Sequence, residues 1–320
     1  MYNTKTLNNC QIEVDKDFSP RRRQAEKLSL CYDALGERFR AERVDRCGTF
    51  LEFQLTEEEA KLHSANFCKD RLCPMCNWRR SKKIFAQVSA CMDHVERDGF
   101  RFIFLTLTVK NCPFSELSET ISALLNGWKS LYRKRDFQKR VCGSFRTLEI
   151  TVNRKTCTFH PHLHVILVVK PSYFSGKDYL STQKWAELWQ KSCSLDYVPV
   201  VHVEAVKSGK LDAVEALQKD RSFRSAVKEV SKYVAKGSDY LDGEFEEMLL
   251  RVSHLLDALA GRRLCSFTGV LKDAAAQLRL DDMEDGDLVH TETEVRSDVA
   301  CVVVRYMWRS GVYEREVVET

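Results

Sequence analysis

The chain has 320 residues, of which 44% are hydrophobic and 30% charged, and its formal net charge is +4. This length allows one large or two to three small domains with an ordinary buried core. No stretch reaches the ~20 apolar residues of a membrane span, and residues 1–17 lack the basic-then-apolar order of a signal peptide, so we expect a cytoplasmic protein. Residues 281–320 hold 11 acidic and 4 basic side chains, which leaves a basic body suited to a polyanionic partner.

The N-terminal part of the chain, residues 1–46, is predicted to be a helical segment. Residues 1–18 are polar and we expect them to be loosely held. Ser19-Pro20 is typical of a helix start, and the apolar spacing that follows predicts a helix over Arg21–Val44. The next module opens at Cys47-Gly48 and contains a predicted strand, Phe50–Leu55.

Cysteines in this module have the spacing of a zinc site. Cys68, Cys73 and Cys76 supply three thiolates, and the Cys-x-x-Cys pair gives the tight turn that tetrahedral zinc needs. Cys47 is the favoured fourth ligand, because a following glycine lets backbone amides approach the sulfur, and His63 is the alternative. With 13 cysteines scattered along the chain, a reducing compartment is a better interpretation than a disulfide framework.

Basic side chains with an interleaved tryptophan surround the cysteines. Residues 69–83 hold six basic side chains against one acidic one, a composition typical of a nucleic-acid surface. An amphipathic helix follows over residues 84–95 and completes a module that we bound at 47–100. The residues predicted to contact DNA are Arg71, Trp78, Arg79, Arg80, Lys82 and Lys83.

Two strands further along are predicted to carry a divalent-metal site. Side chains alternate faces along a strand, so His162 and His164 lie on one face of the predicted strand His160–Val169. Glu149 lies on the polar face of the preceding strand, which a short hairpin loop joins to it. Two imidazoles and a carboxylate can hold Mg²⁺ or Mn²⁺ with positions left for water or phosphate. His160 is less favoured as a ligand, because a proline follows it and distorts the alternation.

A helix predicted over Ser222–Lys236 places three polar residues on one face. Glu229 and Tyr233 are four residues apart, and Lys236 follows three residues later. Together with a metal, this set indicates attack by a phenolate on a phosphodiester. The same spacing alone is also typical of a solvated helix face, so the interpretation depends on the histidine strand upstream.

The remaining pattern favours an α+β fold with a central antiparallel sheet flanked by helices and an N-terminal zinc-binding module. Strands and helices alternate without the glycines of a dinucleotide-binding fold. We expect four parts: residues 1–46, the cysteine-rich module 47–100, a nicking domain 101–240 and an accessory region 241–320. The predicted elements of these last two parts, besides those above, are a strand at Phe102–Val109, helices at Ser115–Phe137, Thr182–Cys193 and Glu244–Leu259, a strand at Val198–Val206, and a hairpin of Val299–Trp308 with Val312–Val318.

Four motifs, in order, resemble those of one enzyme family. Phe104–Thr108, then His160–His164, then Glu229–Lys236 resemble the three motifs of HUH endonucleases, and Asn66–Ser81 is similar to the cysteine-rich motif of one group among them. That group comprises the rolling-circle replication initiators of small bacterial plasmids that use a single tyrosine and a catalytic glutamate. The resemblance covers about Cys47 to Tyr240. We assign the strand Phe102–Val109 no direct chemical role.

The resemblance implies a function and partners. Tyr233 would nick one strand of a plasmid origin, keeping a 5′-phosphotyrosine and leaving a 3′-hydroxyl; Glu229 would direct a terminating hydrolysis, and Lys236 would neutralise the phosphate or lower the pKa of the tyrosine. The implied partners are a single-stranded or hairpin nick site, a host helicase and a host polymerase. A homodimer is a further candidate, and the sequence does not define the oligomeric state. Three alternatives stay open: a mobilisation relaxase or single-strand transposase, a zinc-dependent DNA-binding regulator, and a zinc phosphoesterase.

Overall fold

The computed structural model describes residues 4–206, 213–232, 235–291 and 302–318. These residues form two compact units. Unit 1 contains residues 4–83, 236–253 and 285–291 with 302–318, and unit 2 contains residues 84–206, 213–232 and 235 with 254–284. The four-part division expected from the sequence stays a prediction, because compactness does not show which parts fold alone. No helix among the described residues is long and apolar enough to span a membrane.

Unit 1 packs helices against a four-stranded antiparallel sheet with strand order β10-β9-β1-β2. The predicted C-terminal hairpin is confirmed, and its first strand pairs with β1 over Phe50–Leu55. Residues 302–318 are therefore part of the same sheet as the strand β1 of the cysteine-rich module. The elements of unit 1 are α1 (Thr4–Glu13), the π-helix η1 (Val14–Phe18), α2 (Ser19–Ala34), α3 (Arg38–Asp45), β1 (Phe50–Leu55), β2 (Ala60–Ala65), the start of α4 (Pro74–Arg97), α9 (Gly237–Tyr240), the start of α10 (Phe245–Leu259), β9 (Val302–Arg309) and β10 (Val312–Val318).

The N-terminal segment differs from the prediction in two ways. Residues 4–18 are helical instead of loosely held, because Leu7, Cys10, Val14 and Phe18 form a buried stripe at helical spacing. The single helix expected over residues 21–44 is two helices, since the chain turns at Gly36, whose φ of +78° suits glycine.

Unit 2 is built on a six-stranded sheet in which β3, β5, β6, β7 and β8 follow the order β7-β3-β6-β5-β8 and the short β4 also pairs with β6. All strand pairs of this sheet within the described residues are antiparallel, which confirms the predicted fold class. Its elements are the rest of α4, β3 (Arg101–Thr108), β4 (Cys112–Pro113), the 3₁₀ helix η2 (Phe114–Glu116), α5 (Leu117–Arg133), α6 (Arg135–Gln138), β5 (Val141–Asn153), β6 (Thr158–Val169), η3 (Pro171–Phe174), α7 (Thr182–Cys193), β7 (Val201–Val206), α8 (Ala213–Val230), the end of α10, β8 (Cys265–Gly269) and α11 (Val270–Gln277).

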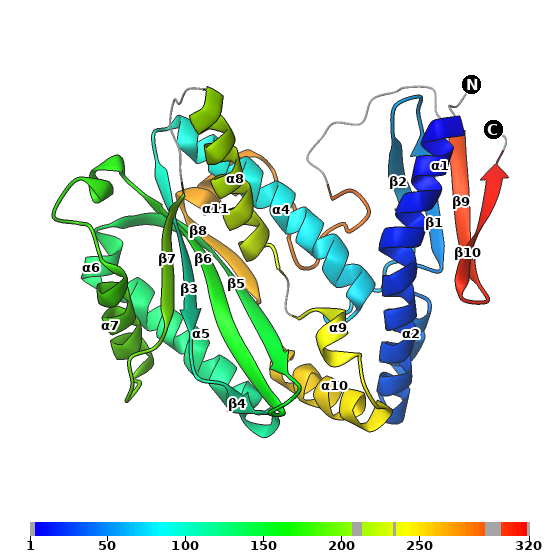
Figure 1. Ribbon diagram of the computed structural model, residues 1–320, viewed down its shortest axis with the longest axis horizontal. Helices are drawn as coiled ribbons and strands as arrows, with labels where there is room; N and C mark the ends of the chain where they lie inside the picture. Colours follow the sequence, from blue (N-terminus) through cyan, green and yellow to red (C-terminus); the bar gives the residue numbers. More distant parts are fainter. Residues whose placement is uncertain (1–3, 207–212, 233–234, 292–301, 319–320) are drawn as a thin grey trace. The chain divides into compact units, whose positions relative to one another are not determined.

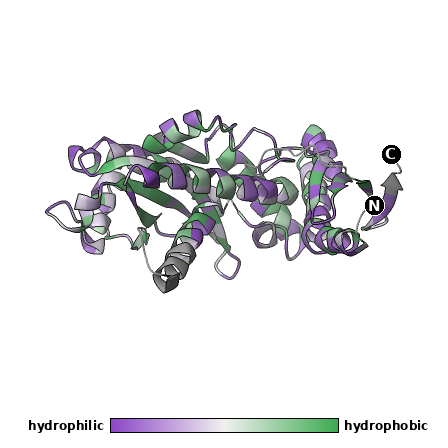
Figure 2. Cartoon of the chain, turned by 90° about the horizontal axis from the view of Figure 1, so that it is seen from above, coloured by the Kyte–Doolittle hydropathy of each residue, from purple (hydrophilic) through white to green (hydrophobic). Residues whose placement is uncertain are grey.

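Apolar residues concentrate on the central strands of this sheet (Figure 2). In β6, Leu163, Val165 and Leu167 are fully buried on one face. Helices α5 and α7 pack together beside the sheet (Figure 1). On the face that carries the histidines, Phe223 of α8 packs edge-on against Phe102 of β3, with ring centroids 6.4 Å apart. One end of that face is therefore covered by a helix.

Candidate functional site

The carboxylate–histidine cluster, Glu149 with His162 and His164, forms on two adjacent strands of unit 2. Glu149 of β5 lies directly opposite His162 of β6 in the antiparallel register, and Thr147 lies opposite His164. Residues directly opposite share one face of the sheet, so the pairing brings the three predicted ligands together. All three side chains are buried, and their ligand atoms lie within 4.8 Å of one another.

Three atoms of this cluster converge on one point. His164 Nε2 lies 2.8 Å from Glu149 Oε2, His162 Nε2 lies 3.3 Å from the same oxygen, and the two Nε2 atoms are 3.2 Å apart. An octahedral ion with bonds of about 2.1 Å has adjacent ligands about 3.0 Å apart. The cluster therefore fits three adjacent ligands of a hexacoordinate cation and itself supplies none of the other three.

Hydrogen bonds at the far ring nitrogens fix which imidazole nitrogen faces the cluster. His162 Nδ1 donates to the backbone carbonyl of His160 at 3.1 Å, which leaves Nε2 as the ligand atom. His164 Nδ1 lies 3.2 Å from the hydroxyl of Thr106 on β3. Such partners orient metal-binding histidines and raise their basicity. The contact of Thr106 with His164 was not expected from the sequence, although the strand that carries Thr106 was identified.

The protonation of the cluster also suits a cation. Burial would raise the pKa of Glu149, but hydrogen bonds and charge interactions with His162 and His164 outweigh it and hold that pKa well below its usual range. Burial, with contributions from His162 and Lys232, outweighs the opposing effect of Glu149 and lowers the pKa of His164. An ionised carboxylate beside a neutral imidazole is the ligand state that a divalent cation requires.

His160 is not part of the cluster, as expected, but the reason given from the sequence is wrong. The strand pairing continues through Pro161, which lies opposite Ile150, and His160 lies opposite Thr151. The alternation is therefore intact. Proline is tolerated because the pairing of β3 with β6 ends at His162, so β3 has no residue opposite Pro161.

The helix that carries Glu229 is shorter at its end than predicted. It ends at Val230 instead of Lys236, and Lys236 has an extended conformation just before α9. The Ser231 hydroxyl bonds to the Val227 carbonyl, and beyond it the Thr147 hydroxyl donates to the backbone carbonyl of Lys232 at 3.4 Å. A tertiary contact thus replaces the next helical hydrogen bonds. Glu229 and Lys236 do not share a helical face, which corrects the prediction.

The chain after α8 reaches the face of the sheet that carries the carboxylate–histidine cluster. Thr147, whose hydroxyl bonds to the Lys232 carbonyl, lies opposite His164 in the sheet, and the ammonium of Lys232 forms an ion pair with Glu229. Tyr233, the predicted nucleophile, lies outside the described residues but follows Lys232 directly in sequence. Lys232 was not singled out by the sequence analysis. The other tyrosine nearby, Tyr240, is fully buried and donates to the Leu72 carbonyl, which is a structural role.

The cysteine cluster of unit 1 consists of Cys47, Cys68, Cys73 and Cys76, all buried. The sulfur of Cys47 lies 3.6 Å from that of Cys76 and 3.5 Å from that of Cys73, and the Cys68–Cys76 distance is 3.7 Å. A tetrahedral zinc with bonds of 2.3 Å has sulfurs about 3.8 Å apart. The four thiols therefore fit a closed tetrahedral site. His63 is not a member of the cluster, and its ring lies 6.5 Å from that of His290.

Backbone amides support the sulfurs. The amides of Cys68, Lys69 and Asp70 donate to the sulfurs of Cys47, Cys76 and Cys68 at 3.2–3.4 Å. The expectation that a backbone amide approaches the Cys47 sulfur is confirmed by the Cys68 amide, whereas the amide of Gly48 itself bonds to the Asn66 carbonyl. Burial and the neighbouring thiols raise the pKa of Cys47 well above its usual value; a bound cation reverses this effect by stabilising thiolates.

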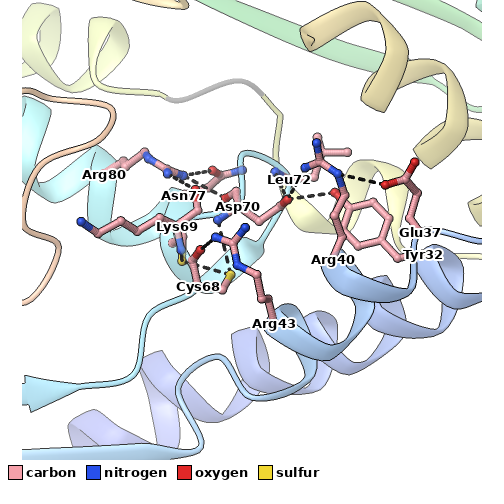
Figure 3. A network of polar contacts seen from close by, with 11 residues as sticks. Tyr32, Glu37, Arg40, Arg43, Cys68, Lys69, Asp70, Leu72, Asn77 and Arg80 are labelled. Atoms are coloured by element: carbon pink, nitrogen blue, oxygen red, sulfur yellow. Dashed lines mark hydrogen bonds and ion pairs between the residues drawn. The ribbon is translucent and has the colours of Figure 1, made fainter. Parts of the chain in front are cut away.

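A polar network holds the loop that bears these amides (Figure 3). The buried Asp70 carboxylate accepts hydrogen bonds from the hydroxyl of Tyr32 and a guanidinium nitrogen of Arg40, both at 2.9 Å. Arg43 donates to the Cys68 carbonyl, and Arg80 donates to the Lys69 carbonyl. The one acidic residue in this basic stretch is thus a structural anchor, and Arg80 has the same task.

Three of the six predicted DNA-binding residues are buried, which corrects their assignment to an exposed surface. Arg79 donates to the carbonyls of Leu288 and Val289, and Lys83 donates to that of Asp287; with Arg80 they stabilise unit 1. A contact with DNA stays a prediction for Arg71, Trp78 and Lys82. The Trp78 ring is partly exposed and has the Lys82 ammonium 4.5 Å from its centroid.

Comparison with known proteins defines the class. The family described as "Replication protein" matches residues 59–314. A "Protein rep" of Lactiplantibacillus plantarum is 42% identical over 82% of this chain and 82% of its own length. One of Bacillus amyloliquefaciens is 39% identical over 87% of both chains, and one of Streptococcus pneumoniae serotype 2 is 37% identical over 88% of this chain and 85% of its own. No solved structure shows a significant match.

The chain belongs to this family of replication proteins. The resemblance to rolling-circle plasmid initiators is thereby confirmed, and the protein is an initiator of plasmid replication.

Proposed function

We propose that this initiator nicks one strand of its plasmid's origin through Tyr233 at the carboxylate–histidine cluster. The observation that carries the proposal is the position of Lys232. Its carbonyl is bonded to Thr147, the direct sheet neighbour of His164, and Tyr233 is the next residue. A phenolate needs to approach a metal-bound phosphate closely, and this connection supports that approach.

Glu149, His162 and His164 would hold Mg²⁺ or Mn²⁺. Such an ion polarises a phosphate and stabilises the charge that develops on it. The residues around the ion orient its ligands and carry out the exchange of bonds at phosphorus. Thr106 and the His160 carbonyl orient the two imidazoles, and Tyr233 forms a bond to phosphorus as the bond to the 3′-oxygen breaks. That oxygen takes a proton and becomes the primer end for a host polymerase, after a host helicase opens the duplex.

Glu229 and Lys232 would control the terminating step. The ammonium of Lys232 contacts an oxygen of the Glu229 carboxylate, so a water cannot take that position while the ion pair is closed. We infer that a DNA phosphate draws Lys232 away and frees Glu229 to take a proton from water. The oxygen of that water forms a bond to the phosphorus of the second phosphodiester as the bond to the 3′-oxygen breaks, and the 3′-oxygen takes a proton, so no other tyrosine is needed. Lys236 would neutralise a DNA phosphate, although it does not share the helix of Glu229.

The cysteine cluster would bind zinc and shape the module that contacts origin DNA. Its ligands are four thiols without an open position, which is the pattern of structural zinc sites. Arg71, Trp78 and Lys82 are the proposed DNA contacts nearby.

Tyr233→Phe tests the proposed function. The wild type, incubated with a single-stranded origin oligonucleotide and Mn²⁺, should form a covalent adduct visible on a denaturing gel. The variant should bind the same DNA and form none, whereas Tyr197→Phe, a matched control in unit 2, should form it normally. Adducts at the wild-type level in Tyr233→Phe would refute the nucleophile, and a wild type that binds but never cuts would favour the non-enzymatic regulator.

A further inference from the structure

The face of the sheet that carries the carboxylate–histidine cluster extends across β3 to the edge strand β7 (Figure 1). Thr106 of β3 lies opposite His164 of β6 on one side and opposite His202 of β7 on the other. Residues directly opposite one another share a face in an antiparallel sheet. The side chain of His202 therefore lies on the same face as the carboxylate–histidine cluster, two strands away.

His202 differs from the cluster histidines in its distance and its exposure. Strands lie about 4.8 Å apart, so two strand spacings separate the backbones of His202 and His164 by about 10 Å. That separation excludes His202 as a ligand of the same cation. Its side chain is 62% exposed, with Glu204 Oε2 at 3.6 Å from its Nε2. An imidazole is thus presented to solvent beside the cluster.

The surface between the two histidines is continuous. Phe104 of β3 stacks on His164 with ring centroids 5.7 Å apart and contacts His202 at 6.1 Å. The phenyl ring of Phe104 therefore contacts both histidine rings. We place the scissile phosphate of a single DNA strand at the cluster. From there the strand extends either over this surface or in the opposite direction along the sheet.

We propose that His202 is a positioning residue that binds a DNA phosphate within two nucleotides of the cleaved one. The inference rests on the proposed nicking function, because the cluster defines where the scissile phosphate lies. Contacts to phosphates fix the register of a nucleic acid on a protein, and an imidazole N–H supplies such a contact. The competing explanation is that a polar edge strand merely prevents association of sheets; in that case His202 has no effect on DNA.

Single uncharged phosphates test the proposal. Origin oligonucleotides carrying one methylphosphonate each, at successive positions around the cut, are bound to Tyr233→Phe and to Tyr233→Phe with His202→Ala, and Kd is measured by fluorescence anisotropy. His202→Ala should weaken binding of unmodified DNA about tenfold, the size of one hydrogen bond to a charged group. At one position, a methylphosphonate should weaken binding to the Tyr233→Phe protein by about the same factor as His202→Ala does. The same methylphosphonate should not weaken binding to the protein that also carries His202→Ala. His202→Lys should restore affinity.

Lys191→Ala is the matched control, because it removes an exposed cationic side chain from α7 and should leave Kd unchanged. The proposal is overturned if His202→Ala and methylphosphonate weaken binding independently, so that their effects multiply, at every position. It is also overturned if the one position at which the two effects are not independent lies more than two nucleotides from the cut. Nicking by the wild type maps that cut and is read separately. If the effects of His202→Ala and methylphosphonate depend on each other but the wild type does not nick the DNA, the phosphate contact is retained and the proposed nicking function is rejected.

Discussion

The two ligand clusters of this protein differ in how they are completed. The cysteine cluster has four buried thiols at tetrahedral spacing, and amides from the loop of residues 68–70 donate to its sulfurs. The carboxylate–histidine cluster has three ligand atoms within 3.3 Å of one another. Four soft ligands close a site, whereas three ligands on one side leave room for a substrate oxygen. We therefore propose that the closed cysteine cluster serves folding and that the carboxylate–histidine cluster serves chemistry.

His164→Ala should produce the largest effect. Removing one ligand should lower the rate of nicking by about two to three orders of magnitude, as loss of transition-state charge stabilisation does. The thermal unfolding of the protein should change little, because this cluster is not needed to close the core. Nicking of a supercoiled origin plasmid with Mn²⁺ measures the effect, and His94→Ala on α4 is the control. A rate within a few-fold of wild type would remove the cluster from the mechanism.

Glu229→Gln should separate the two strand-transfer steps. The first nick should remain within about twofold of wild type, while termination should slow by about 100-fold, the usual contribution of a general base. A plasmid with two origins should then yield multimeric single-stranded products. Glu187→Gln, on the exposed surface of α7, should give circles of normal length. Normal circles from Glu229→Gln would identify a surface carboxylate without a catalytic task.

Cys73→Ser should lower the stability of the fold, whereas His164→Ala should lower the rate of nicking. Zinc content should fall from one per chain, and the free energy of unfolding of unit 1 should drop by more than about 3 kcal/mol, because metal binding is coupled to folding at such sites. Cys31→Ser is the matched control, since that thiol is equally buried in unit 1 but lies outside the cluster. It should retain zinc and cost about 1 kcal/mol. Retention of zinc by Cys73→Ser would reject the four-cysteine site.

Thr106→Val should have the smallest effect of this series. The variant keeps the shape of the side chain and removes the hydroxyl that contacts His164 Nδ1. Loss of such an orienting partner typically lowers metal affinity or activity by about tenfold. The Mn²⁺ concentration for half-maximal nicking should rise, and saturating Mn²⁺ should restore most of the rate. Thr120→Val on α5 should leave the Mn²⁺ dependence unchanged, and an unchanged dependence in Thr106→Val would show that the contact is incidental.

Much of the site could be predicted because its signals are local. His162, His164 and Glu149 lie on strands joined by a hairpin, so alternation and a short loop define their common face. The cysteine spacing predicted three ligands in the same way. Thr106 could not be assigned, because its contact with His164 depends on β3 pairing with β6 across 58 positions of sequence.

Elements fixed by distant contacts were predicted less well. The valine stripe of the helix around Glu229 continues in sequence to Val234, yet the helix ends at Val230, where Thr147 of another strand bonds the Lys232 carbonyl. Arg79 and Lys83 have the composition of a DNA surface, but carbonyls of residues 287–289 receive their hydrogen bonds. A basic residue near cysteines is equally suited to DNA and to backbone carbonyls, and sequence alone does not decide between them.

Selective removal of the exchangeable metal tests the contrast between the two clusters most directly. The purified protein is dialysed against EDTA, and zinc content, thermal unfolding and nicking are measured before and after Mn²⁺ is added back. The account predicts that nicking disappears and returns with Mn²⁺ alone, while one zinc per chain and the unfolding temperature persist throughout. Recovery of nicking only after zinc is added, or loss of zinc together with nicking, would contradict the assignment of one cluster to folding and the other to catalysis.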